Sequence, residues 1–283
     1  MLQSMFSGIS GLRTHQQRMD VIGNDIANVN TIGYKQSDVT FKEAYVNTLR
    51  FPAPGSPGLQ VGLGTQMGSI VRDFSGGILM ETGQASNMGI SGEGFFVVAE
   101  PVAGGANYFT RAGDFLLDMD PATGRTYVIN PDGKRLRGVL TANLGDPAPD
   151  MTGKTEADLV DLTLPAGTTS FTIGVDGVIY ASVNGAAPAV CGRVAVATFD
   201  NTNGLGAIGN NLYVKTDSAN IHAFTNPGSN GCGQVFQGYL ENSNVDLARE
   251  FTDMIITQRG FQANSKSITT SDEMLIELLQ LKR

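Results

Sequence analysis

An apolar residue recurs at every seventh position at both ends of the chain, and this repeat limits the fold more than any other feature. Near the amino terminus the row consists of Met5, Leu12, Met19 and Ile26. Near the carboxyl terminus the row consists of Met254, Phe261, Ile268 and Leu275. Such spacing over about four heptads is typical of helices that pack along their length. We therefore predict a long helix at each end and expect the two to pair as a coiled-coil stem.

The second helix has a clear candidate start. Leu247 and Phe251 precede its row in register, and Ser243 with Asp246 three residues later resembles a capping box. The cap-like string TTSDE at 269–273 falls inside the predicted helix and could kink or restart it. Between the apolar positions, the first helix has Gln16, Gly23 and Asn30 on the same seam, and the second has Gln258, Ser265 and Asp272. These gaps reduce the apolar surface that a lone helix pair could bury. We expect both ends to be weakly ordered in the monomer and helical only in an assembly.

The middle of the chain has a different pattern. Residues 51–64 hold three prolines and four glycines, which indicates an irregular connector. Short apolar or alternating runs then predict strands, and Asp-Gly pairs at 132–133 and 176–177 predict tight hairpin turns. The predicted runs are 94–100, 108–120, 126–130, 170–182 and 192–199. The fold class is therefore α+β, with terminal helices at 1–32 and 240–283, an extended or β connector at 33–80, and a β-rich domain at 81–239.

Composition excludes several classes of protein. The net charge of -8 argues against a nucleic-acid binder, because no basic footprint is present. No run of about 18 apolar residues exists to predict a membrane span. The first twenty residues lack the cationic and apolar regions of a secretory signal peptide. The two cysteines, Cys191 and Cys232, are expected to be buried free thiols; a single disulfide in an oxidising compartment is the alternative.

Motifs for catalysis or cofactor binding are weak. The glycines at 62–68 and 89–94 do not match the dinucleotide fingerprint, and we interpret them as turn or bulge glycines. The string DMDPATGR at 118–125 has the spaced acids of a calcium loop but lacks the later ligands. His15 and His222 have no evident nucleophile partner. We predict no enzyme activity, no cofactor and no metal, and keep a hydrolase with a triad assembled across the fold as the alternative.

Three ordered blocks of sequence resemble the axial proteins of the bacterial flagellum, the rod and hook subunits. They are MDVIGNDIANVNTIGYK at 19–35, MGISGEGFFVV with YFTRAGDFLLD at 88–118, and the last 46 residues from Gly238. RDFSGG at 72–77 and the last block favour a hook protein. The short length and SPGLQVGLGT at 56–65 favour a distal rod protein, since typical hook proteins carry a further outer β domain. The hook reading is preferred; a distal rod subunit or a non-polymerising rod–hook junction adaptor is the alternative.

The resemblance implies a structural role in motility. Subunits of this family are exported unfolded through a type III apparatus, without a cleaved signal peptide, and polymerise under a cap chaperone at the growing tip. The implied partners are other copies in a helical homopolymer, neighbouring axial proteins and the export apparatus. The implied location is the extracellular hook or the periplasm-spanning basal body. The terminal helices would form the inner tube wall, with the β domain outside it.

The Asn-rich exit of the first helix has a role in this interpretation. Asn28 can cap or turn the chain, and Gly33 can adopt the left-handed conformation that ends a helix. Tyr34 and Lys35 would then begin the crossing to the outer layer. The predicted assembly residues are Met5, Leu12, Met19, Ile26, Asn28, Gly33, Leu247, Phe251, Met254, Phe261, Ile268 and Leu275.

Overall fold

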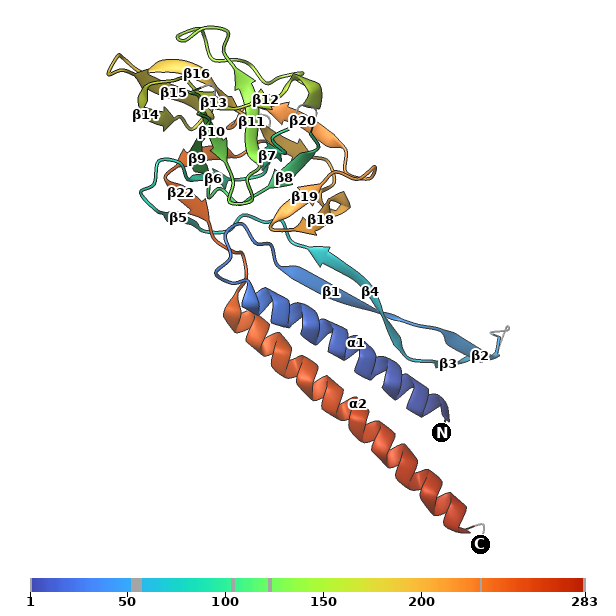
Figure 1. The fold of residues 1–283 in the computed structure, drawn as a ribbon. Coiled ribbons are helices and arrows are strands. Elements are labelled where there is room, and N and C mark those ends of the chain that lie inside the picture. The colour runs from blue at the N-terminus through green and yellow to red at the C-terminus, as the bar shows by residue number, and fades with distance from the viewer. Residues whose placement is uncertain (1, 52–57, 103–104, 122–123, 230, 282–283) are drawn as a thin grey trace. The chain divides into compact units, whose positions relative to one another are not determined.

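The computed structural model describes residues 2–51, 58–102, 105–121, 124–229 and 231–281. The chain forms two compact units. The first, called the helical unit, comprises Met1–Val29, Gln36–Asp73 and Val245–Arg283. The second, called the β unit, comprises Asn30–Lys35 and Phe74–Asn244. A helix at each end and a β-rich middle confirm the predicted α+β class (Figure 1). The predicted 33–80 connector contributes residues to both units.

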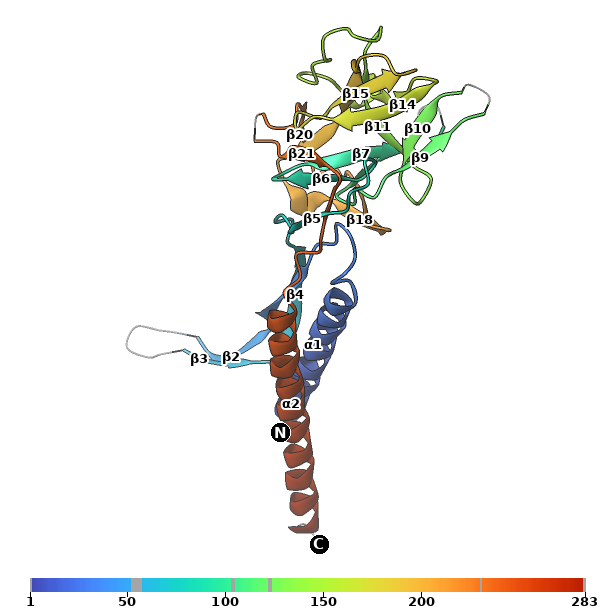
Figure 2. The same cartoon turned by 90° about the vertical axis from the view of Figure 1, so that its left-hand side faces the viewer.

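The helical unit contains two antiparallel helices, α1 (Leu2–Ala27) and α2 (Leu247–Leu281), which lie side by side in both views (Figures 1 and 2). A ribbon of antiparallel strands runs along α1. Its paired strands are β1 (Ser37–Glu43) with β4 (Thr65–Arg72) and β2 (Val46–Arg50) with β3 (Leu59–Gly62). The Ser10 hydroxyl accepts a hydrogen bond from the Thr65 amide at 3.1 Å. The predicted irregular connector is therefore partly an ordered hairpin; its residues 52–57 lie outside the described residues.

Helix α2 starts three residues later than the sequence pattern indicates. The Asp246 carboxylate accepts from the amides of Ala248 at 2.9 Å and Arg249 at 3.4 Å, so Asp246 is the cap and Ser243 is not. The helix also continues without a break through TTSDE. The hydroxyls of Thr270 and Ser271 donate to carbonyls in the preceding turn, at Lys266 and Ser267. Because these hydroxyls bond back along the helix, they do not cap a new one.

The β unit is built mainly on one large antiparallel sheet. Its main path runs in the order β14-β15-β16-β11-β7-β8-β19-β18. Separate pairs join β21 to β6 and β22 to β5. The strands are β5 (Leu79–Glu81), β6 (Met88–Ser91), β7 (Phe95–Ala99), β8 (Asn107–Thr110), β9 (Leu116–Met119), β10 (Thr126–Ile129), β11 (Arg135–Leu140), β12 (Val160–Asp161), β13 (Thr163–Leu164), β14 (Thr168–Ile173), β15 (Val178–Val183), β16 (Ala189–Val194), β17 (Val196–Phe199), β18 (Gly206–Gly209), β19 (Leu212–Val214), β20 (Ile221–Thr225), β21 (Gln234–Gln237) and β22 (Tyr239–Glu241). Two 3-10 turns lie at Glu156–Asp158 and Thr202–Gly204.

Strand β7 explains how the β unit forms its core. All five of its residues are buried. Phe96 and Val98 belong to one apolar cluster, while Phe95 and Val97 belong to a second. Because side chains alternate between the faces of a strand, an unbroken apolar run means that both faces are covered. The strand predicted at 94–100 is confirmed, and the structure adds that both of its faces are buried.

Other sequence predictions for the middle also hold. Runs 126–130 and 170–182 form β10 and the β14–β15 hairpin, whose Asp-Gly turn places Gly177 at φ 73°. Run 108–120 is a strand only at its ends, because residues 111–115 between β8 and β9 have no regular secondary structure. Cys191 and Cys232 are buried free thiols, as predicted, and burial raises the pKa of both. Within the described residues, no helix is long and apolar enough to cross a bilayer.

Candidate assembly surface

Small and polar residues bring α1 and α2 together. The Ser4 and Ser271 hydroxyls lie 3.4 Å apart, and Arg18 Nη2 pairs with Asp253 Oδ1 at 3.1 Å. A Cβ added at Gly8 would lie 2.9 Å from Ile268 Cγ1. One added at Gly11 would lie 2.7 Å from the Asn264 amide nitrogen, and one at Gly260 would lie 2.6 Å from the His15 ring. On α1 the contact row is Ser4, Gly8, Gly11, His15 and Arg18, whose spacing alternates between four and three residues.

The apolar rows predicted from sequence flank this contact row. On α1, Met5, Leu12, Met19 and Ile26 are each half-buried. On α2, Met254, Ile268 and Leu275 are half-buried, while Leu247, Phe251 and Phe261 are exposed to 39%, 50% and 38%. The predicted apolar rows are therefore not the whole contact: close approaches between the helices involve Ile268 and a row of α1 shifted by one residue from the predicted row. Glycine and serine allow the backbones to approach closely, and the larger side chains are displaced to the sides.

Apolar surface consequently remains uncovered on both helices. Phe6 is 66% exposed, and Ile255 and Ile256 are 58% and 54% exposed. Monomeric proteins rarely leave contiguous apolar surface of this kind in water, and where it occurs it marks an interaction site. The geometry is that of a helix pair with apolar flanks available to other molecules.

Among the described residues of the helical unit, His15 and Glu250 have shifted pKa values. His15 packs edge-on against Phe41 at 5.6 Å, and its Nδ1 is buried without a hydrogen bond. Burial, and to a lesser extent Arg18, lower the pKa of His15, so the neutral ring is favoured. Glu250 is buried and accepts a hydrogen bond from Gln36. Its pKa is raised, first by burial and then by repulsion from Asp25.

The exit from α1 differs in detail from its prediction. The helix ends at Ala27, and the Asn28 side chain donates back to Asn24. Gly33 has the predicted positive φ, 67°, but it lies six residues beyond the helix end and does not terminate it. A Cβ at Gly33 would lie 2.6 Å from the Ala112 amide. Glycine is required there because the backbone passes directly over residues 111–112 of the β unit.

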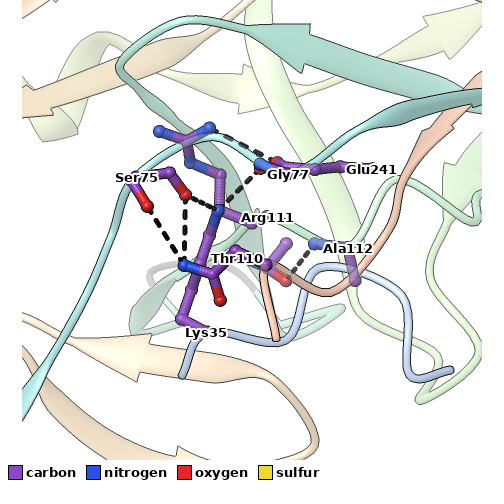
Figure 3. Close-up of polar contacts among 8 residues, drawn as sticks. Lys35, Ser75, Gly77, Thr110, Arg111, Ala112 and Glu241 are labelled. Atoms are coloured by element: carbon purple, nitrogen blue, oxygen red, sulfur yellow. Dashed lines mark hydrogen bonds and ion pairs between the residues drawn. The ribbon is translucent and has the colours of Figure 1, made fainter. Parts of the chain in front are cut away.

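A buried ion network holds this exit segment within the β unit (Figure 3). Lys35 Nζ donates to Glu241 Oε1 at 2.6 Å and to the Ser75 carbonyl at 2.6 Å. The same Glu241 oxygen accepts from the Gly77 amide at 2.8 Å, and Arg111 Nη1 donates to the other carboxylate oxygen at 3.3 Å. The Glu241 carbonyl accepts from the Gly33 amide at 2.8 Å. One glutamate therefore joins four segments that are distant in sequence.

Sequence reasoning placed Lys35 at the crossing but missed its partners. Glu241 and Arg111 stand in the runs GYLENS and YFTRAG, where a single charge interrupts apolar or small residues. A charge in a run otherwise suited to burial is the one signal that could have indicated a paired, buried ion.

The weak motifs for other chemistry gain no support. Within the described residues, no cluster of three or more His, Cys, Asp or Glu side chains could hold a metal. Asp118 and Asp120 lie at the β9–β10 hairpin, and residues 122–123 of that loop lie outside the described residues. The side chain of His222 also lies outside what the structure describes.

Comparison with known families matches three parts of the chain. Residues 5–35 match the flagella basal body rod protein model, and residues 89–181 match the flagellar hook protein FlgE/F/G D1 domain. Residues 237–281 match the flagellar basal body rod FlgEFG protein C-terminal model. These segments contain nearly all of the blocks on which the sequence resemblance rests.

Relatives that match over their whole length are also flagellar rod and hook proteins. The chain is 39% identical over 290 residues to the flagellar basal-body rod protein FlgG of Bacillus subtilis, covering 100% of both. It is 26% identical over 453 residues to the flagellar hook protein FlgE of Borreliella burgdorferi, again covering 100% of both. A crystal structure of Helicobacter pylori flagellar hook protein FlgE2 shows 13% identity over 73% of this chain and 56% of that one, with a TM-score of 0.20. That likeness is too low to support an argument.

Proposed function

The chain belongs to the flagellar axial protein family of rod and hook subunits, and from this premise we propose that it is a structural subunit of the distal rod. The sequence patterns favoured a hook subunit, and we now prefer the alternative, a distal rod subunit. The flagellum-specific motifs are common to both subunits, so motifs alone do not separate them.

Alignment length is the observation that carries the proposal. The rod relative aligns over 290 positions, close to the 283 residues of this chain. The hook relative aligns over 453 positions, so 170 of them have no residue of this chain opposite. The chain therefore has the length of a rod subunit and lacks the extra sequence of that hook protein.

The exposed apolar flanks of α1 and α2 support polymerisation with other copies. A contact between unlike surfaces that does not close produces an open helical array. In this proposal the subunit is exported by the flagellar type III apparatus, adds below a cap chaperone and contacts neighbouring axial proteins. Its place is the periplasm-spanning basal body, and its function is structural.

Electron microscopy of the purified protein at rising concentration tests polymerisation. Wild type should form tubular assemblies, and Phe261→Asp should prevent them by placing a charge on the exposed apolar flank. Gln262→Asp is the matched control, because Gln262 is its exposed polar neighbour. Assembly by Phe261→Asp at the wild-type concentration would count against this surface.

Location separates rod from hook. Gold-labelled antibody against the chain should mark isolated hook–basal bodies within the basal body and leave the hook unlabelled. Label along the hook would overturn the distal-rod assignment while leaving the axial family intact.

A further inference from the structure

Helix α2 extends beyond the end of α1. Ser4 lies opposite Ser271, two residues precede Ser4 in α1, and ten residues of α2 follow Ser271. The last eight residues of α2, about 12 Å at the rise of an α-helix, therefore have no α1 residue beside them (Figure 1). These residues, 274–281, are called the α2 overhang.

The α2 overhang carries apolar residues on several sides, with Glu277 and Gln280 as its polar residues. Met274, Leu278 and Leu281 share one face, and Ile276 and Leu279 lie on others. Their exposed fractions range from 47% for Ile276 to 83% for Leu281. Large apolar side chains that gather on an exposed surface mark an interaction site, and a short helical end without packing is marginal in water. The overhang therefore needs a packing partner, and the described part of the single chain does not supply one.

A groove on the same unit has the complementary character. It lies between α1 and the start of β4 and has a volume of about 450 Å³. Its apolar lining comes from Phe6, Ile9 and Met67, and Phe6 is two-thirds exposed. Arg13 also lines the groove. The groove therefore combines apolar residues with a positive charge, in a chain whose net charge is -8.

The overhang carries the matching charge. Glu277 lies three residues after Met274 and four before Leu281, so it shares their face of the helix. That face has the order apolar, acidic, apolar, apolar at spacing i, i+3, i+4, i+7. Since the overhang continues away from the groove-bearing length of its own α1, the groove that it fills belongs to another molecule.

We propose that the α2 overhang of one copy lies in the α1–β4 groove of the next copy, with Glu277 facing Arg13 and Leu278 against Phe6. This rests on the proposed polymeric function and names the contact by which copies join. Groove and overhang are different surfaces, so each added copy presents a free groove or a free overhang and growth continues without closing.

Charge exchange in the full-length chain tests the pairing. Arg13→Glu and Glu277→Arg should each raise the concentration needed for assembly at least tenfold, and the double variant should restore it. Arg125→Glu, on an exposed residue of the β unit, is the control and should leave that concentration unchanged. Circular dichroism of each variant monitors the helices.

A mixed cross-link tests the contact directly. In a background with Cys191 and Cys232 replaced by alanine, Phe6→Cys copies mixed with Leu278→Cys copies should form covalent dimers on oxidation, and neither preparation should do so alone. Tubes that form without the mixed cross-link or the charge rescue would overturn this contact and leave the proposed function standing. A wild-type protein that never assembles would overturn both.

Discussion

Lys35 Nζ and Glu241 Oε1 lie 2.6 Å apart with both side chains fully buried, although 206 residues separate them in the chain. Arg111, 2% exposed, pairs with the other oxygen of the same carboxylate. Two cations therefore bind one carboxylate inside the β unit. Removing the carboxylate is expected to destabilise the protein more than removing one of the cations.

Glu241→Gln is expected to destabilise the protein by about 3–5 kcal/mol, because it removes the carboxylate charge that two buried cations share. Lys35→Met should cost less, since the Arg111–Glu241 pair stays balanced. Urea unfolding of the full chain, followed by near-UV circular dichroism, measures both. Lys134→Met breaks the partly exposed pair with Glu100 and should cost at most about 1 kcal/mol. A larger loss for Lys35→Met than for Glu241→Gln would contradict the charge argument.

Gly11→Leu is expected to weaken the helix pair by about 1–3 kcal/mol, because a side chain there meets Asn264. Gly23→Ala is the matched control on the same helix. Nothing lies within 4 Å of a Cβ at Gly23, so alanine should stabilise α1 by up to about 1 kcal/mol. Thermal melts followed at 222 nm distinguish the two, and equal effects would argue against close packing at Gly11.

The helix pair is expected to lose stability as pH falls below the ordinary His15 pKa of 6.5. The folded-state pKa of His15 is lowered, so the unfolded chain binds the proton first and acid favours unfolding down to that lower pKa. His15→Gln should remove this part of the pH dependence. Melting temperatures of both proteins between pH 7.5 and 5 provide the measurement, and parallel curves would show that His15 does not contribute.

Glu250→Gln is expected to stabilise the helical unit at pH 7. The pKa of Glu250 is raised by burial and by Asp25, so its charged form opposes folding at neutral pH. The gain should shrink as pH falls toward the ordinary pKa of 4.5, because Glu250 in the folded protein, whose pKa is raised, takes up its proton before the unfolded chain does. Exposed Glu273→Gln is the control. A Glu250→Gln gain that stays constant with pH would point to packing instead.

Dilute monomer is expected to show weakly ordered ends, since the predicted row residues of α1 and α2 are half-buried or exposed in the single chain. Helical circular dichroism should rise with concentration as copies associate. The β unit has its own apolar core, so the circular dichroism of its strands should stay constant as concentration rises. A concentration-independent helical signal would contradict this expectation.

The amino-acid sequence by itself determined the helices at both ends, the strand FFVVA, the Asp-Gly turns and the flagellar family. These depend on local spacing, turn chemistry and ordered blocks, all of which can be read along the chain. Only the tertiary structure decided which helical row makes the contact, because close approach selects small residues over the most apolar ones. It likewise assigned Glu241 to Lys35 and Arg111, and showed that Gly33 serves a crossing over residues 111–112. Pairing across 206 residues depends on the path of the whole chain, which no local pattern records.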